Sequence, residues 1–240
     1  MNKRTKNRIL EIDPYLAPFE NDINLRTELF LSKRKELLGN GKKIKNFANA
    51  HKYFGFHRTR TGWVYREWAP AADEMYLTGD FNNWDVYGCP MTKLENGIFE
   101  VQLKGKNALK TGEKVQAVVV NSGNALRRIP LYATRVVQDP QTYLWCAEIE
   151  NVEGKFPWTD NGFVPEKTPF IYECHIGMAQ EKGAVGTYKE FTENILPRIK
   201  ELGYNAIQIM AIMEHPYYGS FGYQVSNFFA PSSRYGTRKD

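Results

Sequence analysis

The sequence has few of the residues that build disulfide or metal frameworks. Cysteine occurs three times, at Cys89, Cys146 and Cys174, and this odd number at wide spacing excludes a disulfide framework. The histidines, which show no metal-ligand spacing with one another or with cysteine, are His51, His57, His175 and His215. We therefore expect a protein of a reducing compartment, the cytoplasm, with no bound metal.

Long apolar runs are also missing from the 240 residues. None approaches the roughly 18 residues that a membrane-spanning helix needs, so we expect no membrane partner. The N-terminal stretch "MNKRTKNRIL" is basic but lacks the apolar core of a signal peptide. With 42% hydrophobic and 25% charged residues, the composition is that of an ordinary folded protein of one or two domains.

The net charge of +5 is unevenly distributed along the chain. Residues 1–60 hold fourteen Lys and Arg against six Asp and Glu, so the remaining residues are slightly acidic. A basic arm can bind nucleic acid, but the sequence has no zinc pattern, no RNA-binding aromatic motif and no recognition-helix signature. We interpret the basic arm as the solvated face of an N-terminal helix and expect no nucleic-acid partner.

Residues 1–50 are predicted to form a helical segment. Within it, the two prolines of "DPYLAPF" (13–19) favour an extended conformation. "GNGKK" (39–43) is expected to break the helix that precedes it. That helix is predicted to be amphipathic from about residue 22, because leucines recur near helical spacing at Leu25, Leu29, Leu37 and Leu38.

Residues 51–150 are predicted to form a β-sandwich. Short β-rich runs alternate with turn signals such as "DFNNWD" and "ENG", and this spacing is typical of antiparallel strands in two packed sheets. The predicted strands are Gly62–Pro70, Met75–Phe81, Gly97–Leu103 and Lys114–Val120.

A linker is predicted at 151–169, where Gly, three prolines and charged residues gather. Residues 170–240 then read as strand, helix and strand: "FIYECHI" (170–176), "GTYKEFTENILPRIKELG" (186–203) and "NAIQIMAI" (205–212). Two apolar strands joined by a helix predict a βαβ unit with a parallel pair. One helix leaves the edges and faces of such a pair bare, so we expect this α/β part to be unfinished at Asp240.

The predicted helix at 186–203 carries its own start and stop signals. Thr187 and Glu190 fit a capping box, and Gly203 is placed to end the helix. Pro197 is expected to kink the helix or to open it locally. One apolar stripe is predicted at Phe191, Ile195, Ile199 and Leu202.

Candidate binding residues follow the second predicted strand, in "MEHPYYGSFGY" (213–223). Function gathers at the carboxyl ends of parallel strands, so Glu214 and His215 are a candidate acid/base pair, with two structural polar groups as the alternative. Rings on a Gly-rich loop suit a sugar, because its apolar C–H face stacks on a ring while its hydroxyls bind polar groups. We predict Tyr223 as a ligand residue. The phenylalanines expected to pack under the loop are Phe221, Phe228 and Phe229.

Two tryptophans of the predicted sandwich are candidates for a second sugar site. "DFNNWD" places Trp84 in a polar turn, and "REWAP" places Trp68 beside Pro70. An exposed tryptophan on a β-sandwich provides a flat platform for glucan. The alternative, a tryptophan of the core, applies more to Trp68 than to Trp84.

These residues lie in stretches that resemble the N-terminal third of the 1,4-α-glucan branching enzymes of glycoside hydrolase family 13. The stretches are "LEIDPYLAPFE", "YREWAPAADEMYLTGDFNNWD" and "IYECHIGMAQEKGAVGTYKEFTENILPRIKELGYNAIQIMAIMEHPYYGSFGYQVSNFFAPSSRYGT". The "GDFNNW" turn by itself marks the broader carbohydrate-binding module family 48, which also occurs in debranching enzymes and kinase regulatory subunits. The third stretch is long and more specific.

The resemblance implies an N-terminal helical segment, a carbohydrate-binding sandwich and then a (β/α)₈ barrel, of which residues 170–240 are the first βαβ unit. It implies a retaining double displacement, in which an aspartate attacks an α-1,4 bond and a glutamate protonates the leaving oxygen. A glucan 6-hydroxyl then takes the glycosyl unit and forms an α-1,6 branch. The implied partner is an α-1,4-glucan such as glycogen, bound by a monomer that needs no metal or organic cofactor.

Residue by residue, the resemblance makes Tyr223 the ring that stacks on the sugar beside the cleaved bond. It places Glu214 and His215 near that pocket, in the same stretch as Tyr218. The positions that it associates with glucan binding on the sandwich are Trp68, Pro70 and Trp84.

Two departures from the family pattern shape the prediction. Some modules of this type use a second tryptophan late in the sandwich, and "NSGNALRR" (121–128) holds none. The catalytic carboxylates of the family lie on later barrel strands, and no "DVVHSH"-like motif occurs before Asp240. We therefore expect a fragment of a branching enzyme that is inactive by itself. The alternatives are a non-enzymatic glucan-binding module and a debranching-type hydrolase of family 13.

Overall fold

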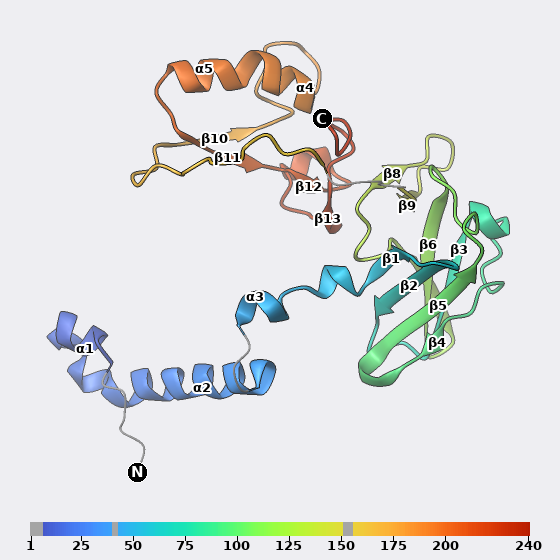
Figure 1. Cartoon of the computed structure of the whole chain (residues 1–240), viewed down its shortest axis with the longest axis horizontal. Coiled ribbons are helices and arrows are strands. Elements are labelled where there is room, and N and C mark those ends of the chain that lie inside the picture. Colours follow the sequence, from blue (N-terminus) through green and yellow to red (C-terminus); the bar gives the residue numbers. More distant parts are fainter. Residues whose placement is uncertain (1–6, 40–42, 151–155) are drawn as a thin grey trace. The chain divides into compact units, whose positions relative to one another are not determined.

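The computed structural model describes residues 7–39, 43–150 and 156–240 (Figure 1). The chain divides into two compact units, Met1–Lys52 and Tyr53–Asp240. None of the helices in the described ranges combines the length and the apolar character that crossing a membrane requires. The domain boundaries predicted from the sequence stay predictions.

Helices make up most of the described residues of the first unit. The longest of them is α2, Glu20–Leu38, and the others are α1 (Ile9–Ile12), η1 (Pro14–Phe19), α3 (Ile44–Phe47) and η2 (Ala50–Lys52). Gly39 follows α2 with a φ of +57°, but residues 40–42 of the predicted "GNGKK" break lie outside the described residues.

Two expectations for this unit need correction. "DPYLAPF" is not extended, because Pro14 occupies the first position of a 3₁₀ helix, where its missing N–H costs nothing. The Asp13 side chain accepts a hydrogen bond from the Tyr15 N–H at 3.0 Å and caps this helix. The leucines of α2 do not form a covered stripe, since Leu25 and Leu29 are 65% and 70% exposed.

The second unit contains the predicted antiparallel sandwich. One sheet has the strand order β1-β2-β5-β4, and every pair in it is antiparallel. Its strands are β1 (Gly55–Arg58), β2 (Gly62–Trp68), β4 (Thr92–Lys93) and β5 (Ile98–Lys104).

The other sheet has the order β3-β6-β9-β8, with β7 paired to β6, and is also antiparallel. Its strands are β3 (Glu74–Gly79), β6 (Lys114–Asn121), β7 (Asn124–Arg128), β8 (Val136–Gln138) and β9 (Trp145–Glu148). The core cluster takes Tyr65 and Phe99 from the first sheet and Leu77 and Val115 from the second. The two sheets therefore pack face to face, as the alternation of strands and turns predicts.

The predicted parallel pair is also confirmed. Strands β10 (Ile171–His175) and β11 (Ala206–Met210) run parallel, with Ile171 opposite Ala206 and His175 opposite Met210. Residues 156–169 of the predicted linker are exposed and hold no helix or strand, whereas residues 151–155 lie outside the described residues.

The connection between these strands is helical but not uniform. It begins as α4 (Tyr188–Glu190), widens to a π-helical turn at Phe191–Ile195 and continues as α5 (Leu196–Glu201). The π turn ends at Ile195, two residues before Pro197, so the helix opens locally next to the proline that was expected to disturb it.

The ends of this helix follow the sequence signals. The predicted capping box is present, with the Thr187 hydroxyl accepting from the Glu190 N–H at 3.1 Å. Gly203 follows the helix with a φ of +89°, the left-handed conformation expected of a terminating glycine. Phe191 and Ile199 are buried, but Leu202 is 68% exposed and does not belong to the buried stripe.

A short hairpin ends the second unit. It pairs β12 (Met213–Glu214) with β13 (Asn227–Pro231), and the loop between them carries the aromatic stretch. Strand β13 contacts the sandwich: the Asn227 Nδ2 donates to the Pro130 carbonyl at 2.9 Å, and Ala230 belongs to the sandwich core. This contact places the base of the aromatic loop against the sandwich.

Candidate functional site

The turn that carries Trp84 is held by hydrogen bonds within "GDFNNWD". The Asn82 Oδ1 accepts from the Gly79 N–H at 3.0 Å, and the Trp84 N–H donates to the Gly79 carbonyl at 2.9 Å. Asn83 and Trp84 both have positive φ angles, 54° and 61°. A Cβ at Gly79 would lie 2.3 Å from the Lys114 carbonyl oxygen, so only glycine fits against β6.

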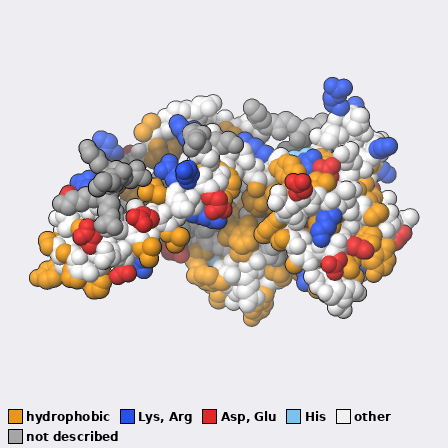
Figure 2. Space-filling model, turned by 90° about the horizontal axis from the view of Figure 1, so that it is seen from below, with side chains coloured by type: hydrophobic (Ala, Val, Ile, Leu, Met, Phe, Trp, Pro, Cys, Tyr) orange, Lys and Arg blue, Asp and Glu red, His pale blue; other side chains and the backbone are white. Residues whose placement is uncertain are grey.

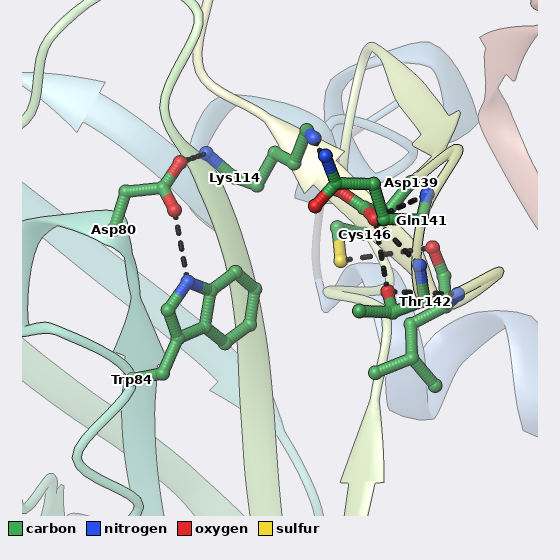
Figure 3. Close-up of polar contacts among 8 residues, drawn as sticks. Asp80, Trp84, Lys114, Asp139, Gln141, Thr142 and Cys146 are labelled. Carbon is green, nitrogen blue, oxygen red and sulfur yellow. Dashed lines mark hydrogen bonds and ion pairs between the residues drawn. The ribbon is translucent and has the colours of Figure 1, made fainter.

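Asp80 joins this turn to the neighbouring strand. Its Oδ1 accepts from the Trp84 indole N–H at 2.8 Å, and its Oδ2 accepts from the Lys114 backbone N–H at 2.7 Å (Figure 3). The indole edge is therefore fixed by a carboxylate that is itself fixed by β6. A half-buried ring of fixed orientation can offer a flat face to a ligand without losing side-chain freedom on binding.

Charged and polar groups continue from Lys114 to the loop before β9. The Lys114 Nζ lies 2.5 Å from the Asp139 Oδ2, while the other Asp139 oxygen accepts from the backbone N–H groups of Gln141 and Thr142 at 3.0 and 2.9 Å (Figure 3). The Lys114 ammonium and these backbone donors hold the pKa of Asp139 well below its usual range. Asp139 in turn raises the pKa of Lys114.

Sequence reasoning did not find these partners of Trp84. Asp80, Lys114 and Asp139 are separated in sequence and meet only when β3, β6 and β9 pair in one sheet. The one local signal was "GDFNNWD" itself, whose aspartate precedes the tryptophan by four residues.

Trp68 and Pro70 lie on the other sheet, at the end of β2. Trp68 is 54% exposed, which argues against a core tryptophan, and its indole N–H donates to the Asn96 carbonyl at 3.1 Å. A Cβ at Gly97 would lie 2.4 Å from the Pro70 Cα, so Gly97 allows the two segments to pack closely. Trp68 and Pro70 therefore form an exposed apolar corner, whereas Trp84 belongs to the turn after β3.

The loop between β12 and β13 exposes its tyrosines. Tyr223 is 81% exposed and Tyr217 is 62% exposed, while Tyr218 is partly covered. The Tyr223 N–H donates to the Ser220 carbonyl at 3.0 Å, so a tight turn presents the ring. Tyr223 therefore has the accessibility that a sugar-stacking ring needs.

The prediction that all three phenylalanines pack under this loop is wrong for two of them. Phe221 does contact the interior, with its ring 6.2 Å from that of His175 and nearly perpendicular to it. Phe228 and Phe229 instead lie on β13, and Phe229 stacks on Tyr132 of the sandwich with ring centroids 4.6 Å apart. As consecutive residues of a strand the two rings point to opposite faces, and the Phe228 ring is 61% exposed.

Glu214 and His215 are completely buried. The Glu214 carboxylate accepts from the Ser233 N–H at 2.7 Å and from the His215 N–H at 3.1 Å. The His215 Nδ1 lies 2.9 Å from the Met213 carbonyl oxygen. Because their polar atoms bond to the chain itself, the structure favours the structural alternative for both residues. A direct contact with substrate stays a prediction.

Within the described ranges, no group of three or more His, Cys, Asp or Glu side chains lies close enough together to hold a metal ion. Cys89, Cys146 and Cys174 are free thiols, all buried. Burial raises the pKa of each thiol, that of Cys146 to about 11, so none is activated as a nucleophile.

The comparison with known proteins begins with the sandwich. Residues 53–141 match the family model of carbohydrate-binding module 48, the isoamylase N-terminal domain. Solved structures with a similar fold include a pullulanase from Bacillus acidopullulyticus (19% identity, TM-score 0.59, 78% of this chain and 26% of that one). They also include the catalytic module of the glycogen-degrading pneumococcal virulence factor SpuA (19% identity, TM-score 0.58, 85% of this chain and 34% of that one). At these identities the likeness concerns the fold alone.

The particular relatives are more similar in sequence. The chain is 42% identical over 238 residues to the 1,4-alpha-glucan-branching enzyme of Rhizophagus irregularis and 44% identical over 249 residues to that of Emericella nidulans. It is 40% identical over 243 residues to that of Felis catus. Each alignment covers 97% of this chain, but the chain spans only about a third of the length of these relatives, 34 to 35%. The resemblance to branching enzymes is thus confirmed over nearly the whole chain.

Proposed function

We propose that this chain is the N-terminal, glucan-binding part of a 1,4-α-glucan branching enzyme. The observation that carries the proposal is the identity of 40 to 44% with such enzymes over 97% of the chain. The match of residues 53–141 to a carbohydrate-binding module supports an α-1,4-glucan such as glycogen as the ligand. The expected protein is a cytoplasmic monomer that needs no cofactor.

We propose further that β10, the helix and β11 are the first βαβ unit of a (β/α)₈ barrel. Their parallel pairing supports this assignment, since a barrel consists of such units. Exposed apolar side chains support it as well: Phe170 and Ile171 are 55% and 51% exposed at the start of β10. Figure 2 shows hydrophobic side chains at the surface in patches scattered among polar ones. Further barrel strands would cover Phe170 and Ile171.

The chemistry proposed for the whole enzyme is a retaining transfer. An aspartate attacks the anomeric carbon, a glutamate protonates the leaving oxygen, and a glucan 6-hydroxyl displaces the aspartate to form the branch. The resemblance assigns neither carboxylate to residues 1–240. We therefore expect the 240-residue chain to bind glucan without transferring it, so the iodine stain of amylose should persist after incubation with the purified chain. Loss of stain would contradict this expectation.

In this proposal two aromatic side chains, Tyr223 and Trp84, each bind part of the glucan. Tyr223 stacks on a glucose unit at the barrel end, and Trp84 stacks on one at the sandwich, where the Lys114 ammonium has N–H groups beyond the one that binds Asp139 for a sugar hydroxyl. Trp68 and Pro70 form a further apolar contact on the other sheet.

Affinity electrophoresis in glycogen-containing gels tests this division. We expect Trp84→Ala and Tyr223→Ala each to reduce the retardation by glycogen, and Trp68→Ala to reduce it less. Trp158→Ala is the matched control, because Trp158 is 70% exposed on the segment between the sandwich and β10. Equal retardation of all four variants and the unmodified chain would overturn the proposal. Urea unfolding of each variant separates loss of affinity from loss of stability.

The second candidate is a non-enzymatic glucan-binding module. The observation in its favour is that the sandwich has a core of its own, with Tyr65, Leu77 and Val115 fully buried. Under this alternative all affinity lies in the sandwich, so Tyr223→Ala would leave the retardation unchanged while Trp84→Ala abolishes it.

A further inference from the structure

Three buried rings from distant parts of the sequence meet beneath the aromatic loop. His175 ends β10, His215 follows β12, and Tyr235 lies close to the end of the chain; they are 7%, 0% and 0% exposed. The Tyr235 hydroxyl oxygen lies 3.5 Å from the His175 Nε2 and 3.4 Å from the His215 Nε2. The phenol therefore bridges the two imidazoles by long hydrogen bonds.

The partners of His215 set the direction of these bonds. Its Nδ1 lies 2.9 Å from the Met213 carbonyl oxygen, which can only accept, so Nδ1 carries the hydrogen. In the neutral ring Nε2 then accepts, and the Tyr235 hydroxyl donates to it. The same hydroxyl oxygen accepts from the His175 Nε2–H. This leaves the His175 Nδ1 as an unprotonated, buried nitrogen without a hydrogen-bond partner in the described part of the chain.

The ring of His175 is a packing surface for the loop. The rings of Tyr218 and Phe221 lie 5.9 and 6.2 Å from it, at interplanar angles of 84° and 81°. Edge-to-face contacts of this kind depend on ring orientation. A rotation of the imidazole would therefore disturb both loop residues.

Two glycines allow the loop to approach so closely. A Cβ at Gly177 would lie 2.9 Å from the Tyr218 hydroxyl and 2.8 Å from the Tyr235 ring. A Cβ at Gly222, which has a φ of +83°, would lie 2.3 Å from the Ala211 Cα at the end of β11. The loop is thus pressed against the buried rings on one side and against β11 on the other.

We propose that Tyr235 is a positioning residue for glucan binding: by bridging His175 and His215 it orients the imidazole on which Tyr218 and Phe221 pack, and so holds the loop that presents Tyr223. The inference rests on the proposed function, because Tyr223 acts as a sugar platform only there. Tyr235 is buried and touches no glucan itself.

Protonation of His175 at Nδ1 keeps the hydrogen bond from its Nε2 to Tyr235 but places a charge on a buried ring whose Nδ1 has no partner among the described residues, and this destabilises the arrangement. Burial, and then His215, lowers the pKa of His175 below its ordinary value of 6.5. The titratable and charged groups around it are His215, Tyr235 and Tyr218, with Arg234 5.4 Å above the Tyr218 ring. Glu214 lies beyond, next to His215. The neutral imidazole thus stabilises the ordered loop above about pH 6.5, and this stabilisation is lost as the pH falls from there.

Amide hydrogen exchange of the full chain tests the role of Tyr235. In Tyr235→Phe the bridging hydroxyl is lost but the ring stays, and we expect protection of the Phe221 and Tyr223 amides to fall about fivefold, the scale of one lost hydrogen bond. Tyr188→Phe is the control: its hydroxyl bonds to the Ser232 carbonyl at 3.2 Å rather than to a histidine, and its ring packs edge-on against Tyr235. Equal loop protection in the two variants would overturn the inference.

Hydrogen exchange measured over a pH series gives a second test. If the rings of Tyr235 and His175 served only to fill space, protection of the Tyr223 amide would not depend on the titration of His175. In the unmodified chain, protection of the Tyr223 amide, corrected for intrinsic exchange, should decline between pH 7.5 and 5.5. In His175→Gln, which does not titrate, the decline should be absent, and its persistence would overturn the inference. If Tyr235→Phe fails to fold, seen as loss of protection at the Leu202 amide, whose N–H donates to the Arg198 carbonyl in the helix that packs Ile199 into the same cluster as Tyr235, this series decides by itself.

Maltoheptaose separates the inference from the proposed function. In the unmodified chain we expect it to slow exchange at Tyr223, with a half-saturating concentration about fivefold higher in Tyr235→Phe. If maltoheptaose leaves Tyr223 unaffected in the unmodified chain, the proposed sugar platform is wrong, and the glucan role of Tyr235 with it. If it acts equally on both chains, only the role of Tyr235 is wrong.

Discussion

The sandwich and the parallel βαβ part achieve burial in different ways. The sandwich cluster holds sixteen buried side chains of the described residues, drawn from both sheets, whereas the cluster around β10 and β11 holds five. In β2 the side chains of Trp63, Val64 and Tyr65 are all buried, but in β10 Ile171 is 51% exposed. Two antiparallel sheets cover each other, while a parallel pair with one helix cannot cover both its faces.

A strand that follows one region in the sequence can pack on the other region. Strand β13 follows the βαβ unit in sequence, yet its Ala230 lies in the sandwich core and its Phe229 stacks on Tyr132. The Asn227 side chain bonds to the Pro130 carbonyl, 97 residues away in sequence. The better-covered region therefore supports the less-covered one through β13.

Phe99→Ala should lower the stability of the protein more than the other substitutions proposed below. Phe99 is 1% exposed at the centre of the sandwich, so removing its ring leaves a cavity and should lower the free energy of unfolding by about 3–5 kcal/mol. Urea unfolding followed by tryptophan fluorescence measures this loss. Phe228→Ala, at a residue that is 61% exposed, should change it by less than about 0.5 kcal/mol. Similar losses would show that burial in the sandwich core is not what makes the Phe99 ring stabilising.

Hydrogen exchange compares the regions without mutation. Amides of β6 should be protected at least about tenfold more than those of β10 and β11, which corresponds to about 1.4 kcal/mol in opening free energy. The reason is that Val115 and Val118 of β6 are fully buried, whereas β10 has an uncovered face. Equal protection of β6 and β10 would show that the parallel pair is as stable as the sandwich.

Thr187→Ala should destabilise the βαβ part alone. The Thr187 hydroxyl caps the N-terminus of the helix, and loss of such a cap costs about 1 kcal/mol. Exchange at the Phe191 amide, whose N–H donates to the Thr187 carbonyl, should quicken while exchange in β6 stays the same. Thr187→Ser, which keeps the hydroxyl, is the matched control, and an equal change in both variants would exclude capping as the cause.

Replacing Glu67 should have the smallest effect on the free energy of unfolding. The effect should be confined to the sandwich and should depend on pH. Burial raises the pKa of Glu67, although the Leu131 N–H and the Tyr65 hydroxyl, which donate to its carboxylate, oppose the rise. The folded state then holds a proton that the unfolded chain releases near pH 4.5, so this stabilisation is complete below pH 4.5 and is lost as the pH rises through the raised pKa.

Urea unfolding between pH 4 and 7 measures this dependence. In Glu67→Gln, which does not titrate, the decline attributed to Glu67 should disappear. Glu95→Gln, in an exposed turn, should retain it. The same decline in both variants would assign the pH dependence to other groups.

Much of the fold was predictable because its signals are local. Short strands between turn residues predicted the sandwich, and two apolar runs around a capped helix predicted the parallel pair. "DPYLAPF" misled the prediction, because proline both favours extended chain and starts helices, and the capping Asp13 decides between them. The prediction was also wrong for Leu202, which is exposed. Helical spacing shows which residues share a face of the helix, but not how much of that face the sheet covers.

The candidate site was predictable only as single residues. The turn "DFNNWD" and the loop "YYGSFGY" pointed to Trp84 and Tyr223 because rings in polar, Gly-rich segments are unusual. The spacing of Asp80 and Trp84 in "GDFNNWD" was the one local signal for the groups that orient this region of the sandwich, and nothing in the sequence pointed to Asp139. Their roles depend on strand pairing between β3, β6 and β9.

By itself the sequence determined the class of each segment, because hydrophobic period, turn residues and capping pairs act over a few residues. Its likeness to branching enzymes rests separately on the matching stretches of sequence. Only the tertiary structure decided that Tyr235 lies between His175 and His215, that Glu214 is buried, and that β13 packs on the sandwich. These contacts join residues that are far apart along the chain. They form because strands that share a core bring their ends together, and no local pattern records which ends will meet.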